Sequence, residues 1–408
     1  MRDGDGAAAG VFAGLKVIDC ASFIAAPAAA TILGDFGADV VKVEPPGKGD
    51  AYRGLGDTPG MPQGSAHDWA WLLTGRNKRS LALDLKREEA QAILHRLVRD
   101  ADVFITNYPL PVRRRLGIDA DTLTALNPRL IYGSFTAYGE TGAEAEKTGF
   151  DSTAYWARSG LMDLVKPDPA GPPARSLPGM GDHPSASSLF GAVATALYRR
   201  ERTGQGAVVS TSLLANGIWA NGCYAQAKLC GAHVAGRPPR QQMPNACTNM
   251  YRCRDGRWFM LTMLNEERQF EPLIRAMERP EWLADPRFAT QEARRRHPAE
   301  LIELFDEVFA ARDLAEWRAR MDAAGITFGI IGTLDDMLDD PQMRAAGALV
   351  KFADMDLETV GSAFQISGET KVAPRRGGEV GEHSEALLRE AGYDAAEIAR
   401  LKASGVLG

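Results

Sequence analysis

Asp182 is the residue with the clearest potential for covalent chemistry. It follows Gly179-Met180-Gly181 and directly precedes an apolar pattern of helical spacing. Glycines permit unusual backbone angles and a close approach of a ligand. Free N–H groups and the dipole of a helix N-terminus stabilise a charged carboxylate, so we expect a lowered pKa for Asp182. Such a carboxylate suits a nucleophile, whereas the commoner role for aspartate at this place is a helix cap.

Basic residues gather at three places that could meet an anionic ligand. They are Asn77-Lys78-Arg79, Lys86 and Arg113-Arg114-Arg115. Arg and Lys pair with phosphate oxygens, so these clusters suit a phosphorylated ligand. A solvated basic face is the simpler interpretation of each cluster. His183, beside Asp182, is a candidate general base, although a lone loop histidine more often has no catalytic role.

Several common catalytic motifs are missing. The turn Cys20–Pro27 after the first predicted strand contains no glycine, so it lacks the G-x-G-x-x-G dinucleotide fingerprint. The sequence also has no G-x-x-x-x-G-K-[ST] loop, no G-x-S-x-G and no H-E-x-x-H. The five cysteines include no C-x-x-C pair. We therefore expect no structural metal site and no disulfide framework.

Alternating strand and helix patterns must position these side chains. We predict helices over Pro27–Phe36, Arg87–Arg99 and roughly Ser185–Arg200. The predicted strands are Leu15–Cys20, Asp39–Glu44, Arg79–Leu83, Val103–Thr106, Arg129–Phe135 and Ala207–Thr211. This order predicts a parallel α/β sheet with right-handed crossovers. A ligand would bind at the ends of such strands, at the point where the strand order reverses.

The pattern changes after about residue 220, where it is typical of a smaller α+β unit. Asn249–Cys253 and Trp258–Met263 flank a turn sequence, Arg254-Asp255-Gly256-Arg257, which predicts a β-hairpin. Helical patterns follow at Glu266–Met277, Ala299–Ala311 and Leu314–Ala324. The chain closes with two short helical patterns, Gly381–Gly392 and Ala395–Ala403.

Composition excludes several classes of function. The 408 residues carry 47 Lys and Arg against 53 Asp and Glu, a net charge of −6. This acidic balance argues against a nucleic-acid binder, which needs a basic surface. No apolar run reaches the ~18 residues of a membrane span, and the acidic start Met1–Gly6 is unlike a signal peptide. We expect a cytoplasmic protein of two or three domains.

Short segments along nearly the whole chain resemble class III CoA transferases of the CaiB/BaiF type. In order, they are Gly14–Asp19, Leu33–Glu44, Asn77–Leu81, Ala101–Phe104, Asn107-Tyr108, Arg115-Leu116-Gly117, Asn127–Tyr132, Gly181-Asp182 and Gly381–Ser384. The resemblance implies a large Rossmann-like, CoA-binding domain of residues 1–205 with 345–408. It also implies a small α+β domain at 225–325, linkers at 206–224 and 326–344, and an interlocked homodimer.

The resemblance further implies a reaction. In similar enzymes the aspartate at the position of Asp182 attacks an acyl-CoA thioester, giving a mixed anhydride and CoA thiolate. The thiolate returns to the aspartyl carbonyl, which yields an enzyme-bound CoA thioester and releases the donor acid. An acceptor carboxylate then reverses these steps. Acyl-CoA and a carboxylic acid are thus the expected partners, and no permanently bound cofactor is expected.

The CoA contacts are carried over by position. The resemblance places Ile24 and Ala25 at the thiol end, Leu83, Asp84, Leu85 and Lys86 at the adenine, Asn107, Tyr108 and Arg115 on the phosphate side, and Asp151 at an acidic active-site position. Pro45 stands where many relatives carry a phosphate-binding arginine, for which Arg53 or Arg79 is the expected substitute. Ile24 replaces a glutamine of formyl-CoA transferases, which counts against formyl-CoA and oxalate as substrates.

Two alternatives stay open. α-Methylacyl-CoA racemases share this fold and carry a histidine immediately before the position of Asp151, where this sequence has Phe150. Without a base there, abstraction of an α-proton is poorly supported. A non-catalytic CoA-binding protein is the other alternative. Apolar residues near Phe23 and Tyr155 are expected to line the acyl pocket, and both a dicarboxylate and a medium-sized organic acid remain candidate substrates.

Overall fold

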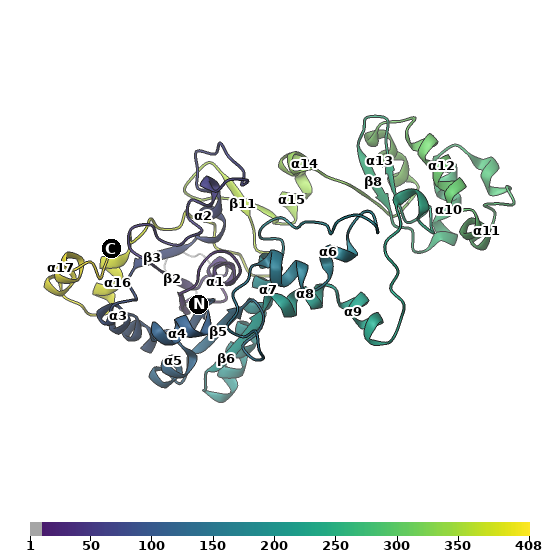
Figure 1. The fold of residues 1–408 in the computed structure, drawn as a ribbon. Coiled ribbons are helices and arrows are strands. Elements are labelled where there is room, and N and C mark those ends of the chain that lie inside the picture. Colours follow the sequence, from purple (N-terminus) through teal and green to yellow (C-terminus); the bar gives the residue numbers. More distant parts are fainter. Residues whose placement is uncertain (1–9) are drawn as a thin grey trace. The chain divides into compact units, whose positions relative to one another are not determined.

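The computed structural model describes residues 10–408. The chain forms two compact units (Figure 1). The large unit comprises the residues up to Met162, Arg175–His233 and Pro341–Gly408. The small unit comprises Asp163–Ala174 and Val234–Asp340. None of the helices in the described part of the chain combines the length and hydrophobicity that a membrane span needs.

A six-stranded parallel sheet organises the large unit, with strand order β3-β2-β1-β4-β5-β6. Its strands are β1 (Lys16–Asp19), β2 (Asp39–Glu44), β3 (Lys78–Ala82), β4 (Val103–Thr106), β5 (Ile131–Thr136) and β6 (Ala207–Ser212). The predicted parallel α/β sheet is therefore confirmed. The strand order reverses between β1 and β4, and in parallel α/β sheets ligands commonly bind at such a point, outside the carboxyl ends of the strands.

Helices cover both faces of this sheet because alternate strand residues are apolar on each side. On one face, α1 (Ala25–Asp35) and α7 (Asp182–Thr203) pack on Val17, Val40 and Val103. On the other face, Ile18, Phe104 and their neighbours meet α3 (Glu88–Arg99), α5 (Ala120–Leu126), α16 (Ser384–Glu390) and α17 (Ala395–Ala403). The C-terminal helices thus complete a core that begins near the N-terminus.

Short elements complete the large unit. The helices are α2 (Trp69–Thr74), α4 (Leu110–Arg115), the π-helix η2 (Asp151–Ala157), α8 (Leu213–Ala220), α9 (Gly222–Leu229) and α15 (Pro341–Ala345), and α6 (Leu161–Leu164) spans the boundary between the two units. A two-stranded antiparallel ribbon pairs β10 (Leu349–Lys351) with β11 (Glu358–Val360). The segment from β5 to β6 holds η2, α6 and α7, and it supplies Asp151 and Asp182.

The small unit is built around three antiparallel strands, β7 (Met250–Arg252), β8 (Trp258–Leu261) and β9 (Phe328–Ile330). The predicted hairpin joins β7 to β8, and Gly256 adopts a positive φ of 81° in its turn. Five helices surround the sheet: α10 (Glu266–Ala276), α11 (Gln291–Arg296), α12 (Pro298–Phe309), α13 (Leu314–Ala323) and α14 (Leu334–Asp339). The core is aromatic, with the rings of Phe259 and Phe309 packed edge to face at 4.8 Å.

Candidate active site

The carboxyl edge of the parallel sheet gathers most of the residues predicted to bind CoA. Ile24 and Ala25 follow β1, Leu83 to Lys86 follow β3, and Asn107 and Tyr108 follow β4. The Asn107 side chain joins the two diverging loops: it accepts from the Ser22 N–H at 2.9 Å and donates to the Ser22 carbonyl at 2.7 Å. These residues therefore follow the carboxyl ends of the strands, and those after β1 and β4 lie where the strand order reverses.

Asp182 lies at the same edge, as the first residue of α7. That helix leads into β6, which runs parallel to β5, so its N-terminus faces the carboxyl ends of the strands. The helix is capped by Gly181, and the Asp182 side chain makes no capping hydrogen bond. Its partly buried carboxylate has no hydrogen-bond partner among residues 10–408. The structure therefore does not use Asp182 as a helix cap.

The pKa of Asp182 is raised to about 7, first by burial and then by the charge of Asp151. The prediction of a lowered pKa was wrong. The helix dipole favours the charged carboxylate by at most ~2 kcal/mol. The loss of water and a like charge nearby outweigh that effect here. Asp182 is consequently a more basic carboxylate than an ordinary aspartate.

Asp151 fixes the turn that carries Asp182. Its buried carboxylate accepts from the Gly181 N–H at 3.3 Å and from the Ser152 N–H at 2.6 Å. Gly181 packs so closely on the ring of Tyr155 that an added Cβ would lie 2.6 Å from its Cγ. The glycine of this turn is therefore required by the close approach of η2. The structure brings together Asp151 and Asp182, which the sequence placed in the same site.

Ile24 and Tyr52 form the opposite side of the site. Gly179 has a φ of +86°, and an added Cβ there would lie 3.5 Å from Cδ1 of Ile24. Tyr52 packs with Ile24 and is buried. Burial, followed by the Asp182 charge, raises the pKa of Tyr52 to about 12. Tyr52 was missed by the sequence analysis, although it lies two residues after Asp50 in a segment of small and charged residues.

A buried charge pair supports the loop after β1. Lys42 is fully buried and lies 2.5 Å from Asp50, and it donates to the Ala21 carbonyl at 2.5 Å. Asp50 in turn accepts from the Ser22 hydroxyl at 3.0 Å, the Phe23 N–H at 3.1 Å and the Tyr52 N–H at 2.9 Å. The pair therefore holds the loop that carries Phe23 and Ile24 to the site.

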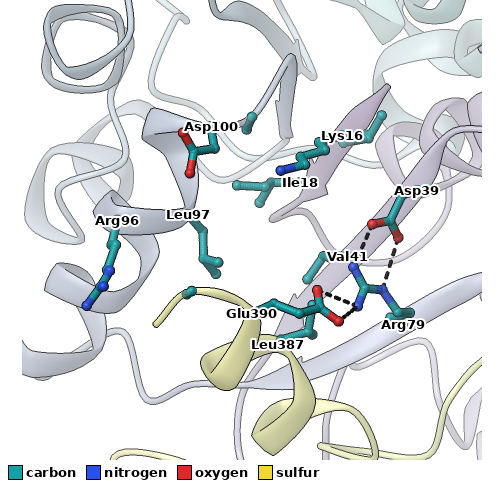
Figure 2. A pocket seen from close by; sticks show the side chains of 13 residues that line it. Lys16, Ile18, Asp39, Val41, Arg79, Arg96, Leu97, Asp100, Leu387 and Glu390 are labelled. Carbon is teal, nitrogen blue, oxygen red and sulfur yellow. Dashed lines mark hydrogen bonds and ion pairs between the residues drawn. The ribbon is translucent and has the colours of Figure 1, made fainter. Parts of the chain in front are cut away.

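Arg79 lies apart from this edge. It lies near the amino ends of the strands, where its guanidinium pairs with Asp39 at 2.5 Å and with Glu390 at 2.8 Å (Figure 2). The cavity around it, of about 250 Å³, is lined by residues near the amino ends of the strands, such as Lys16 and Asp100. The structure does not bring Arg79 to Asp182.

The other basic residues divide into paired and free groups. Lys78 is buried against Asp19 at 2.8 Å, and Arg53 pairs with Glu44 at 2.7 Å. Both are therefore engaged within the protein. Lys86 and Arg115 are exposed, and neither side chain makes an ion pair with another residue of the described chain. These two cations, together with the exposed Lys48 after β2, are available to an anionic ligand at this edge.

Comparison with known proteins places the chain in a family. Residues 12–384 match the model of CoA-transferase family III. The (R)-2-hydroxy-4-methylpentanoate CoA-transferase of Clostridioides difficile is 31% identical over 97% of this chain and 98% of its own length. The succinyl-CoA–D-citramalate CoA-transferase of Chloroflexus aurantiacus is 34% identical over 84% of each chain.

A solved structure shows the same architecture. The crystal structure of a CaiB/BaiF family protein from Brucella suis superposes with a TM-score of 0.83 and 29% sequence identity, covering 94% of this chain and all of that one. Family model, curated relatives and fold agree over nearly the whole length. The chain is an enzyme of the CoA-transferase class and belongs to CoA-transferase family III.

Proposed function

We propose that this enzyme moves CoA between an acyl-CoA and a carboxylic acid, with Asp182 as the nucleophile. The observation that carries the proposal is a partly buried carboxylate at the sheet's carboxyl edge, without a hydrogen-bond partner in the described chain and with a raised pKa. A carboxylate that lacks solvation is a stronger nucleophile than one held by water or by hydrogen bonds.

The first half of the reaction forms and breaks two bonds. An oxygen of Asp182 attacks the thioester carbonyl, the C–S bond breaks, and CoA leaves as the thiolate. The thiolate then attacks the aspartyl carbonyl of the mixed anhydride, and the donor acid leaves as its carboxylate. The acceptor carboxylate displaces CoA from the resulting aspartyl thioester by the same steps in reverse, so no ATP is consumed.

Asp151 contributes to this cycle through its charge. Acylation of Asp182 converts a carboxylate into a neutral anhydride or thioester. The repulsion that raises the pKa of Asp182 in the free enzyme is thereby relieved. The ground state is thus destabilised relative to the covalent intermediates. Asp151 is a positioning residue in this account, because it also holds the Gly181 N–H.

We also propose that CoA lies along the carboxyl edge. In this arrangement Ile24 and Ala25 meet the thiol end, Leu83 to Lys86 meet the adenine, and Asn107, Tyr108 and Arg115 lie on the phosphate side. The exposed, unpaired cations Lys86 and Arg115 support this orientation. Arg79 is not part of the proposal, because Asp39 and Glu390 already engage it at the other edge.

A homodimer completes the proposal. The helices α8 and α9 expose large apolar side chains, including Trp219 at 84% and Leu229 at 82%. Large apolar side chains that are exposed on neighbouring helices are commonly covered by a partner. Sedimentation equilibrium of the purified chain should give twice the mass of 44.0 kDa. A mass of one chain across the concentration range would contradict the dimer.

Trapping of the intermediate tests the proposed reaction. Acyl-CoA and hydroxylamine should convert Asp182 to its hydroxamate, which mass spectrometry of the peptide locates. Asp182→Asn should abolish both modification and CoA transfer. Asp163→Asn, which changes an exposed aspartate paired with Lys166, is the matched control and should retain both. Modification at another carboxylate would contradict the proposal, and solvent deuterium entering the acyl α-carbon without an acceptor would indicate a racemase instead.

A further inference from the structure

Phe23 has an unusual backbone conformation at the edge of the candidate site. Its φ is +63°, and in the described residues only Asn77 and Glu278 share a positive φ among residues other than glycine. A bulky side chain is strongly disfavoured there. Such strain costs on the order of 1–3 kcal/mol and persists only where the surroundings impose it. A glycine at this position would avoid the cost, so the aromatic ring itself is the feature to explain.

The buried pair Lys42–Asp50 imposes this conformation. Asp50 accepts the Phe23 N–H at 3.1 Å and the Ser22 hydroxyl at 3.0 Å, while Lys42 lies 2.5 Å from Asp50 and holds the Ala21 carbonyl. Consecutive residues of the loop are thus fixed by one ion pair. These bonds constrain the backbone of the loop and thereby the position of Phe23.

That position places Phe23 against Phe150. The two rings pack edge to face with centroids 6.1 Å apart, and they are 39% and 62% exposed. Each comes from a different wall of the site. Phe23 precedes Ile24, which meets Gly179, and Phe150 precedes Asp151, which binds Gly181. The aromatic pair therefore joins the two loops that surround Asp182, and it leaves aromatic surface open to a ligand.

The charges around the pair disfavour a second carboxylate. Residues 20–24, 149–157 and 176–183 around Asp182 contain no Lys or Arg, and Arg53, next to Tyr52, is paired with Glu44 at 2.7 Å. The neighbouring cations Lys42 and Arg76 are buried and already neutralised by Asp50 and Asp35, at 2.5 and 2.7 Å. A second carboxylate placed among these segments would meet Asp151 and Asp182, and the segments themselves supply no cation to compensate it. That arrangement is unfavourable at a partly buried site.

We propose that Phe23 and Phe150 form the acyl-binding surface of the Asp182 site and select monocarboxylic acids with an aryl or branched apolar group over dicarboxylates. The inference rests on the proposed function, whose substrate class it specifies. The curated relatives do not decide this point, since one is named for a branched hydroxy acid and the other for a dicarboxylate.

Acceptor competition tests the proposal. Each protein is given 3-phenylpropanoate and glutarate at equal concentration together with one acyl-CoA donor. The amounts of the two products give the ratio of kcat/KM for 3-phenylpropanoate to kcat/KM for glutarate, in wild type and in each variant. We expect wild type to favour 3-phenylpropanoate, and Phe23→Gly and Phe150→Ala to lower the ratio by about tenfold or more, as loss of apolar contact does in a binding pocket. Phe23→Gly is also expected to fold, because glycine adopts this φ without strain.

Tyr198→Ala is the matched control. It removes an exposed aromatic ring from the same helix as Asp182, about 24 Å along it at 1.5 Å per residue, and it should leave the ratio unchanged. A wild-type preference for glutarate, or an equal ratio in wild type and Phe23→Gly, would overturn the proposal.

Calorimetric binding of 3-phenylpropanoate to the intact enzyme separates this proposal from the proposed function. If no acid accepts CoA, the transferase mechanism fails, yet weaker binding to Phe23→Gly than to wild type still supports the acyl surface. Equal binding by the two proteins would contradict the surface whether or not transfer occurs.

Discussion

Asp182 derives its reactivity from what surrounds it and not from the helix it begins. The sequence identified this residue and its glycine turn, but it predicted the wrong direction for the pKa. The helix N-terminus is a local feature that can be read from adjacent residues. Burial and the charge of Asp151 arise from tertiary packing, which brings η2 against Gly181. Neither the burial of Asp182 by distant segments nor its repulsion by Asp151 can be predicted from the residues next to it in the sequence.

The pH dependence of the reaction should report this pKa. Asp182 is a nucleophile only when ionised, so kcat/KM should rise tenfold per pH unit below about 7 and level off above it. Replacement of Asp151 by Asn removes the like charge and keeps an oxygen for the Gly181 N–H, so the acidic limb should move to lower pH. Steady-state rates across the pH range check both curves, and an unmoved limb in Asp151→Asn would show that Asp151 does not influence Asp182.

The stability of the folded protein should also depend on the protonation of Asp182, but in the opposite direction to activity: it should be greater when the carboxyl group is protonated. Because the pKa is raised in the folded protein, folding binds a proton between the unfolded value and about 7, and stability falls as pH rises through that window. Asp182→Asn is neutral throughout. It should therefore be more stable than wild type at about pH 8, by roughly 1–3 kcal/mol, and similar near pH 4. Urea unfolding at both pH values measures the difference, and equal gains at both would exclude a charge effect.

The elements of the large unit follow largely from sequence pattern. The predicted strands Asp39–Glu44 and Val103–Thr106 and the helix Ala395–Ala403 have the observed bounds, and the other predicted elements shift by a few residues. Apolar alternation and helical spacing are local signals, so they identify such elements. The π-helix Asp151–Ala157 was not predicted. Its hydrogen-bond pattern is rare, and it is maintained by packing against Gly181 and α8.

Two glycines of the same segment allow a matched test of that packing. Gly181→Ala would place a Cβ 2.6 Å from the Tyr155 ring, so η2 or the start of α7 must move. We expect a loss of roughly 2 kcal/mol or more in stability and a large loss of transfer activity. Gly191→Ala lies within α7 with nothing within 4 Å of the new Cβ, and it should stabilise the protein by about 0.5–1 kcal/mol. Similar effects of the two changes would show that the close approach does not position Asp182.

The two compact units have separate cores. The large unit is assembled from three stretches of chain, the last of which supplies the C-terminal helices that pack on the face of Ile18 and Phe104. The small unit buries its aromatic core within residues 246–326. The domain bounds expected from the resemblance, 225–325 for the small domain, stay a prediction. The pattern of predicted strands and helices changes near residue 220. The exact domain boundary depends on contacts between residues far apart in the sequence, which a local pattern does not show.

The small unit should fold without the rest of the chain. Its strands and helices are continuous from Val234 to Asp340 apart from the short segment Asp163–Ala174, and its core residues lie inside that stretch. We therefore expect a fragment of residues 234–340 to unfold in one cooperative step. The fluorescence of Trp317, which is fully buried, monitors this step. Phe309→Ala, at the centre of the aromatic cluster, should lower the stability of the fragment by about 3–5 kcal/mol. A fragment without a cooperative transition would show that this core needs the large unit to form, and the small unit would then not be an independent domain.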